Sequence, residues 1–95
     1  MTAATSITNR RISQEGLFTL WEIKGTLTNG ETLDIPTADP ITTSSTVSVV
    51  AVNNITDGTT FGIVSAPYTS ASRLFTITDA GASDDDVRVI YMVEN

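Results

Sequence analysis

Apolar side chains recur at every second position near the end of this 95-residue chain, and this period constrains the fold more than any other feature. The residues that share one parity there are Val87, Val89, Tyr91 and Val93. A period of two places them on one face of a β-strand, whereas a helix would scatter them. Related patterns run through residues 17–27 and 47–55. Thr, Val and Ile are abundant, and β-branched residues suit a pleated, half-buried surface. We therefore predict an all-β domain.

Glycine-containing turns separate these segments. Residues 28–30 (Thr-Asn-Gly) follow the first strand, which is expected over residues 17–27. A three-residue loop with Gly30 in the left-handed conformation pairs Gly25 with Leu33 and keeps the apolar side chains on one face. The sequence therefore predicts a hairpin between residues 17–27 and the segment that ends before Pro36.

The same reasoning applies to residues 56–58 (Thr-Asp-Gly), where a three-residue loop pairs Ala51 with Ile63 and Asn53 with Phe61. A last hairpin is expected between residues 73–78 and 87–93. About six short strands at even spacing are typical of a small antiparallel β-sandwich or a partly open barrel.

Two of the expected strands are apolar on both parities. In residues 47–55, Val50 and Val52 point to the face opposite Val49. In residues 87–93, Ile90 and Met92 point to the face opposite Val89 and Tyr91. Such strands either lie in the middle of a sandwich or have one face covered by a partner.

Residues 1–16 differ in character from the single β domain that we expect over residues 17–95. They are small and polar, and no clear period runs through them. Residues 1–24 carry three bases and two acids, a net charge of +1, whereas residues 25–95 carry two bases and nine acids, a net charge of −7. This segment is either a frayed terminus or an N-terminal arm that orders on a neighbour. The candidate partner-binding residues of the arm are Ile7, Arg10, Arg11 and Ile12. Replacing both arginines with alanine is expected to weaken partner binding and to leave the thermal unfolding of the free domain unchanged.

The composition argues against most enzymes. The chain has no Cys and no His, so it lacks thiolate chemistry, the usual general base and the commonest metal ligand. We expect no catalytic activity and no cofactor. The net charge of −6 disfavours nucleic acid and anionic membrane surfaces as partners. No apolar run approaches a membrane span, and the first residues do not form a secretory signal, so we expect synthesis in a cytoplasm.

Three other features have a structural and a functional interpretation. Asp84, Asp85 and Asp86, with Asp79 nearby, could hold Ca²⁺, but a solvated loop is favoured because three consecutive side chains cannot all point inward. We therefore assign no metal site. Trp21 could stack on a sugar, but its parity favours the core. Tyr68 follows Pro67 in an expected loop and is the better candidate for an exposed aromatic side chain.

A resemblance to known proteins rests on four stretches: residues 25–35 (GTLTNGETLDI), 75–78 (FTIT), the loop 81–86 and the terminal 87–91 (VRVIY). In these stretches the chain resembles the small all-β proteins of tailed-phage virions, in particular capsid decoration (cement) proteins. The resemblance implies a non-enzymatic and often trimeric protein that binds the outside of a capsid lattice. It also implies a terminal arm that grips the shell or a neighbouring subunit.

We therefore expect a virion structural protein that is made in the host cytoplasm, binds the major capsid protein on the outer surface of the shell, and forms a homotrimer. Two alternatives remain open. One is a carbohydrate-binding or adhesin-like β-module that uses Tyr68 and loop hydroxyls. The other is an accessory protein of a phage tail or baseplate.

Overall fold

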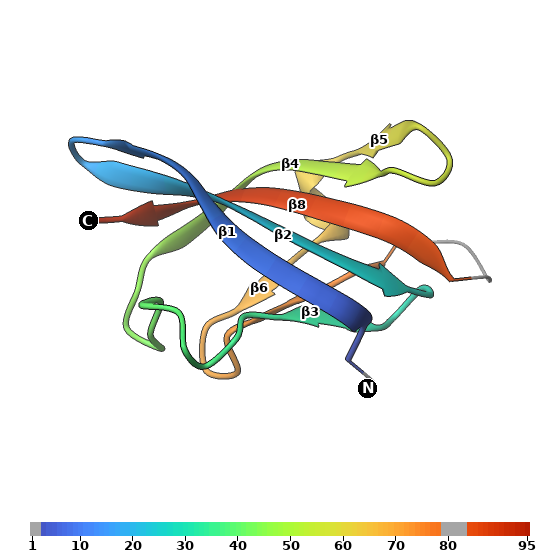
Figure 1. The fold of residues 1–95 in the computed structure, drawn as a ribbon, viewed down its shortest axis with the longest axis horizontal. Coiled ribbons are helices and arrows are strands. Elements are labelled where there is room, and N and C mark those ends of the chain that lie inside the picture. Colours follow the sequence, from blue (N-terminus) through green and yellow to red (C-terminus); the bar gives the residue numbers. More distant parts are fainter. Residues whose placement is uncertain (1–2, 79–83) are drawn as a thin grey trace.

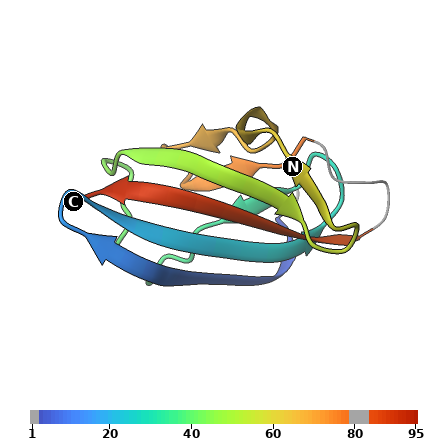
Figure 2. The same cartoon turned by 90° about the horizontal axis from the view of Figure 1, so that it is seen from above.

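Two ten-residue strands, β2 (Phe18–Leu27) and β8 (Asp85–Glu94), form the central ladder of the computed structural model, which describes residues 3–78 and 84–95. The strands are antiparallel and pair without a break, from Phe18 opposite Glu94 to Leu27 opposite Asp85. Three further strands complete a five-stranded sheet in the order β1-β2-β8-β4-β5 (Figure 2). Their bounds are β1 (Thr5–Glu15), β4 (Val47–Asn54) and β5 (Thr59–Phe61).

A smaller sheet lies below the first and covers one of its faces (Figure 1). It consists of β3 (Thr32–Asp34), β7 (Leu74–Thr76) and β6 (Tyr68–Thr69), in the order β3-β7-β6. A 3₁₀ turn, η1 (Ile63–Ser65), leads from β5 towards β6. The predicted all-β class and small antiparallel sandwich are confirmed. The described residues form eight strands rather than about six, because four of the eight have only two or three residues.

The core fills the space between the two sheets. Its buried members on β2 and β8 include Trp21, Ile23, Leu27, Val87, Val89, Tyr91 and Val93, as the alternation predicts. Phe75 of β7 joins the layers, since its ring lies 4.9 Å from that of Tyr68 in the same sheet and 4.9 Å from that of Tyr91 across the core. Tilted aromatic contacts at this spacing add to the free energy gained from burial.

The first predicted hairpin is wrong, although its turn has the predicted backbone. Gly30 is left-handed, with φ = 88°. However, β2 pairs with β1 and β8, and β3 pairs with β7, so the turn carries the chain from one sheet to the other. Gly25 and Leu33 do meet, but across the core. A Cβ atom at Gly25 would lie 2.6 Å from Leu33 Cδ2, so the missing side chain makes room for β3.

The second hairpin is confirmed, with its register shifted by one residue. Phe61 lies opposite Val52 rather than Asn53. The buried side chain of Asn54 explains the shift: its Oδ1 accepts a hydrogen bond from the backbone N–H of Asp57 (3.1 Å) and organises a four-residue loop. Gly58 is left-handed in this loop, with φ = 70°.

The last predicted hairpin is wrong, because β7 and β8 belong to different sheets. The segment that joins them includes residues 79–83, which lie outside the described residues.

The segment that the sequence analysis separates as an arm, residues 1–16, is built into the domain from residue 5 onward. Its strand β1 pairs with β2 along its whole length. Ala4 donates a backbone hydrogen bond to Thr32 O (2.7 Å), which ties the start of β1 to the second sheet. Two register shifts, between Thr5 and Thr8 and between Arg11 and Ser13, interrupt the strand. These shifts break the period of two, which is why the sequence pattern did not reveal the strand.

Gly25→Ala tests the close approach of the two sheets. We expect the added methyl group to destabilise the protein by about 1–3 kcal/mol, because Leu33 and Ala4 occupy the space that it needs. Urea unfolding measures the change. Gly16→Ala is the matched control, since a Cβ atom there would meet nothing within 4 Å. Equal stability of the two variants would contradict the packing described above.

Candidate protein-binding surface

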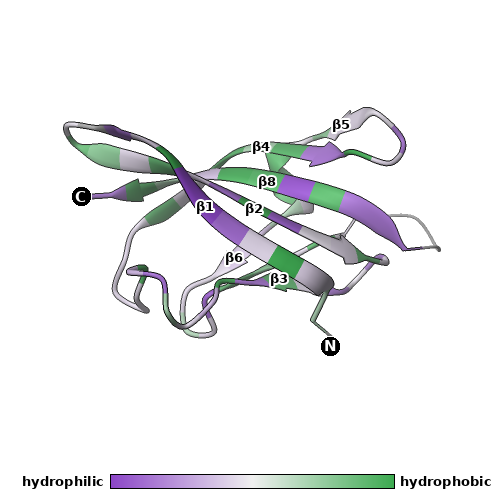
Figure 3. Ribbon diagram, in the orientation of Figure 1, coloured by the Kyte–Doolittle hydropathy of each residue, from purple (hydrophilic) through white to green (hydrophobic). Residues whose placement is uncertain are grey.

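Among residues 3–78 and 84–95, no second layer lies over the outer face of the five-stranded sheet. Side chains of β2 and β8 that point away from the core therefore face the surface, and Figure 3 shows hydrophobic and hydrophilic bands alternating along β8. At the end near the turn between β1 and β2, this face carries a cluster of apolar side chains that we call the outer patch. Its members are Leu17, Phe18, Leu20, Val50, Ile90 and Met92.

Exposure within the outer patch is uneven. Leu17 lies in the two-residue turn between β1 and β2 and is 81% exposed, and Val50 lies at an irregularity of β4 and is 46% exposed. The other four members are half-buried. A shallow groove of about 270 Å³ runs along the patch between Leu17 and Met92 and continues to Thr46 and Ser48. Large contiguous apolar patches on a protein surface often mark interaction sites, which makes the outer patch a candidate for one.

The last residue holds the rim of this groove in place. Asn95 Oδ1 accepts a hydrogen bond from the hydroxyl of Thr19 (2.6 Å), and Asn95 Nδ2 donates to Gly16 O (3.1 Å). The backbone N–H of Asn95 also donates to Leu17 O (2.9 Å). The turn that presents Leu17 is therefore tied to the chain end, which lowers the entropic cost of ordering it on a partner.

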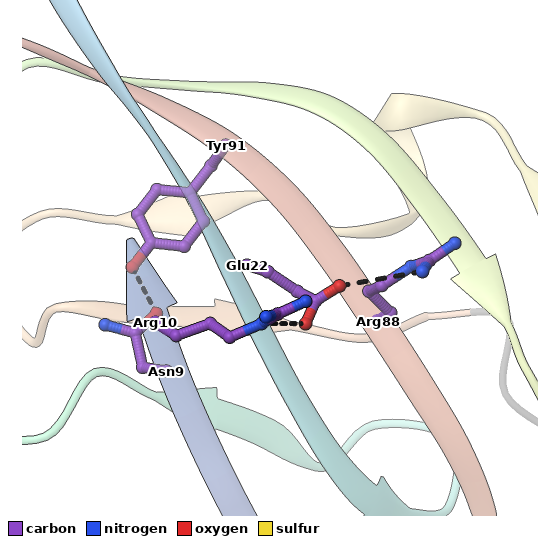
Figure 4. A network of polar contacts seen from close by, with 5 residues as sticks. All are labelled: Asn9, Arg10, Glu22, Arg88 and Tyr91. Atoms are coloured by element: carbon purple, nitrogen blue, oxygen red, sulfur yellow. Dashed lines mark hydrogen bonds and ion pairs between the residues drawn. The ribbon is translucent and has the colours of Figure 1, made fainter. Parts of the chain in front are cut away.

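An ion-pair network lies next to the outer patch on the same face, where Glu22 is opposite Ile90. Figure 4 shows its three residues, Arg10, Glu22 and Arg88. Glu22 lies between two arginines: Arg10 Nε is 2.9 Å from Glu22 Oε1, and Arg88 Nη1 is 3.5 Å from Glu22 Oε2. The Glu22 side chain is only 6% exposed, whereas that of Arg10 is 71% exposed. A buried carboxylate needs such partners, so Arg10 contributes to the attachment of β1.

On the inner side, a second set of contacts attaches β1. The hydroxyl of Tyr91 donates to Asn9 Oδ1 (2.6 Å), and Asn9 Nδ2 donates to Asp39 Oδ2 (2.9 Å). Figure 4 shows the Tyr91 ring reaching from β8 to the side chain of Asn9. Burial raises the pKa of the Tyr91 hydroxyl far above its usual value, so this group remains a hydrogen-bond donor rather than an acid or base at neutral pH.

The four residues predicted to bind a partner do not share one environment. Ile7 packs against the core and Arg10 is paired with Glu22, so both have structural contacts within the domain. Arg11 is exposed and, within residues 3–78 and 84–95, makes no ion pair and no side-chain hydrogen bond. Ile12 is 47% exposed at a register shift. Partner binding by all four stays a prediction, and Arg11 and Ile12 are the two that are free to take part.

The acidic segment near the start of β8 is used structurally where the structure describes it. Asp85 is buried, and its Oδ2 accepts a hydrogen bond from Asn54 Nδ2 (2.9 Å). Asp86 Oδ1 accepts from the hydroxyl of Thr26 (2.7 Å), while Asp84 is exposed. Asp79 lies outside the described residues. Over the described ranges, no three carboxylates, histidines or cysteines gather into a group that could hold a metal ion.

The two aromatic residues considered for sugar binding face inward. Trp21 is buried in the core, as its parity predicts. Tyr68 was expected in a loop, but it lies in β6 with its ring against Phe75, and its hydroxyl is buried without a hydrogen-bond partner. The prediction of an exposed Tyr68 is wrong. The composition around Pro67 is typical of a loop, but Tyr68 begins a two-residue strand that packs its ring against Phe75. The carbohydrate-binding alternative therefore loses the aromatic platform on which it was based.

Two important positions were missed in the sequence. Leu17 was assigned to a strand, yet an apolar residue next to Gly16 in a tight turn is the signal of an exposed side chain. Arg73 was assigned no role; it is left-handed (φ = 55°), and its guanidinium donates to the carbonyl oxygens of Ile35, Pro36 and Ile41. No local pattern in the sequence indicates that Arg73 binds these three carbonyl oxygens, because they are far from it along the chain.

Comparisons with protein-family models, with curated proteins and with solved structures gave no significant match. Among the described residues, no helix has the length and the apolar character that crossing a bilayer requires.

Single alanine variants separate the roles of the two arginines. The ion pair with Glu22 revises the expectation from the sequence that neither arginine affects stability. We expect Arg10→Ala to destabilise the free protein by about 1 kcal/mol, since Glu22 loses its nearer partner, and Arg11→Ala to leave stability unchanged. For a domain of this size, about 1 kcal/mol lowers the unfolding temperature by roughly 4–8 °C. Thermal unfolding followed by circular dichroism measures both. An unchanged midpoint in Arg10→Ala would show that the Glu22 network does not stabilise the fold.

Proposed function

We propose that this chain is a non-enzymatic structural protein that docks on another protein, and that its docking target is the outer surface of a phage capsid. In this proposal it is a decoration protein: it binds the major capsid protein, forms a homotrimer and resides on the virion. The observation that carries the docking role is the outer patch, because a small domain that has already filled its core still exposes contiguous apolar side chains.

The state of the polar groups supports binding over catalysis. The buried ionisable side chains of the described residues serve structural bonds: Glu22 with two arginines, Asp85 with Asn54, and Tyr91 with Asn9. A catalytic group needs access to substrate and a pKa matched to proton transfer. These groups are instead used to hold strands together, which suits a rigid adhesive module.

The capsid as the target rests on the resemblance of residues 25–35, 75–78 and 81–91 to decoration proteins, together with the acidic charge and the β-sandwich. The mechanism is thermodynamic linkage: a protein that binds the assembled shell and not its separated subunits stabilises the shell in proportion to its occupancy. Because a shell repeats the same site many times, docking can be individually weak and still stabilise the whole.

Cosedimentation with purified shells of the phage that carries the gene tests this proposal. We expect saturable binding, greater resistance of the decorated shells to heat, and about tenfold weaker binding for Leu17→Glu, which places a charge in the outer patch.

Val64→Glu is the matched control, because Val64 is 83% exposed but lies in η1 and is not a member of the outer patch. Absence of binding to the shells would refute capsid decoration. Binding to purified tails or baseplates instead would favour the accessory-protein alternative. Equal loss in the two variants would show that the outer patch is not the docking site.

A further inference from the structure

The free edge of β1 is a second feature that the domain leaves unpaired. β1 is the first strand in the order of the five-stranded sheet, so one side of its backbone pairs with β2 and the other has no neighbouring strand in the part of the chain that the structure describes. Among the described residues, no backbone hydrogen bond joins residues 5–15 to anything but β2. An unpaired edge presents N–H and C=O groups that a further strand can bind.

The usable length of this edge is short. The register shifts on either side leave a regular stretch from Thr8 to Arg11, in which four consecutive residues lie opposite Lys24 to Trp21. Bulges of this kind limit uncontrolled pairing between sheet edges. The edge therefore accepts a short extended segment better than a long strand.

The charge of the stretch selects its partner. Residues 8–11 include Arg10 and Arg11 in a chain whose net charge is −6. Arg10 points to the outer face, opposite Glu22, and is paired with it, whereas Arg11 lies opposite Trp21 on the inner parity and is uncommitted. A second copy that paired its own β1 here would add two more arginines to the same short edge. In the antiparallel register centred on Arg10 the two Arg10 side chains would lie directly opposite each other, which is unfavourable in cross-strand pairs.

We propose that the β1 edge binds an extended acidic segment of the partner protein by strand addition, with Arg11 as the charge-reading residue. The inference rests on the proposed docking function and names the chemistry of the segment that docks. Backbone hydrogen bonds to Thr8–Arg11 supply the attachment, and carboxylates of the added strand supply the selectivity.

The surroundings of Arg11 fit a carboxylate-bearing side chain. Arg11 and Gln14 line a cleft of about 320 Å³ that opens between β1 and the loop containing Pro40 and Ile41. Side chains of an added strand alternate between the two faces, so every second one points towards this cleft. Glu94 also lines the cleft but forms no ion pair with Arg11, which leaves the guanidinium available to an incoming carboxylate.

Titration of the isotope-labelled full chain with two end-blocked peptides tests the proposal by NMR. One peptide has about eight residues that alternate Val and Glu, and the other has Lys in place of Glu. We expect the Glu peptide to bind with a Kd of about 1 mM or lower and to shift the amide signals of residues 8–11. The Lys peptide should not bind. Arg11→Glu should weaken binding about tenfold or more.

Lys24→Glu is the matched control. Lys24 is also exposed and, in the part of the chain that the structure describes, has neither an ion pair nor a side-chain hydrogen bond, but it lies on β2 rather than on the edge. If Arg11→Glu and Lys24→Glu weakened binding equally, the attraction would depend on overall charge rather than on the β1 edge, and the proposal would be overturned. So would binding of the Lys peptide, absence of binding by the Glu peptide, or shifts confined to the outer patch.

Concentration-dependent shifts at residues 8–11 without peptide would assign the edge to a second copy and also overturn the proposal. The peptide experiment is independent of the shell experiment. Shell binding without peptide binding refutes strand addition alone, and peptide binding without shell binding refutes the capsid target alone.

Discussion

The unbroken ladder between β2 and β8 is the element on which the rest of the molecule depends. Ten consecutive residue pairs without a bulge give one face that is largely apolar and packs in the core, and a second face whose side chains point outward. The inner face binds the small second sheet through the aromatic contacts of Phe75. Each side of the ladder then accepts one more long strand, β1 or β4, and both of these strands carry irregularities that the central pair lacks. Pairing is regular between the two central strands and irregular in β1 and β4 on either side of them. The irregular strands therefore lie where the backbone is more accessible to a partner.

The sequence predicted what depends on local chemistry and side-chain parity. The alternation of apolar residues predicted the burial of Tyr91 and of the valines on the same face of β8. The turn sequence predicted the left-handed conformation of Gly30. Strand partners did not follow, because a turn specifies that the chain reverses and not which sheet the next strand joins. Gly25 and Leu33 illustrate this: they were expected side by side in one sheet, and they lie face to face across the core. β1 escaped detection because an edge strand has little burial to enforce a period, and its two bulges erase what remains.

The candidate site was partly visible in the same way. Apolar residues on both parities of β8 indicated either a central strand or a face covered by a partner. β8 is the middle strand of its sheet, and its outward-facing apolar residues belong to the outer patch. The sequence also indicated the two arginines of the first segment, but it could not show that they have different roles. Only the tertiary structure shows that Arg10 pairs with Glu22 and that, among the described residues, Arg11 has no such partner. The resulting picture is of a rigid module with two adhesive features. The outer patch offers apolar area, and the β1 edge offers backbone hydrogen bonds and a positive charge. Under the proposed function, two weak and differently specified surfaces would let the protein distinguish an assembled lattice from its free subunits.

The central claim is that β1 belongs to the domain while one of its sides remains unpaired, and hydrogen exchange of the free protein tests it directly. In an antiparallel edge strand, alternate residues direct their N–H groups towards the neighbour and the others direct them towards solvent. The account predicts alternating protection over Thr8–Arg11, with two amides as slow as those of β2 and two that exchange rapidly. Rapid exchange of all four amides would mean that the segment is a detached arm, and slow exchange of all four would mean that the edge is already occupied; either result would contradict the account.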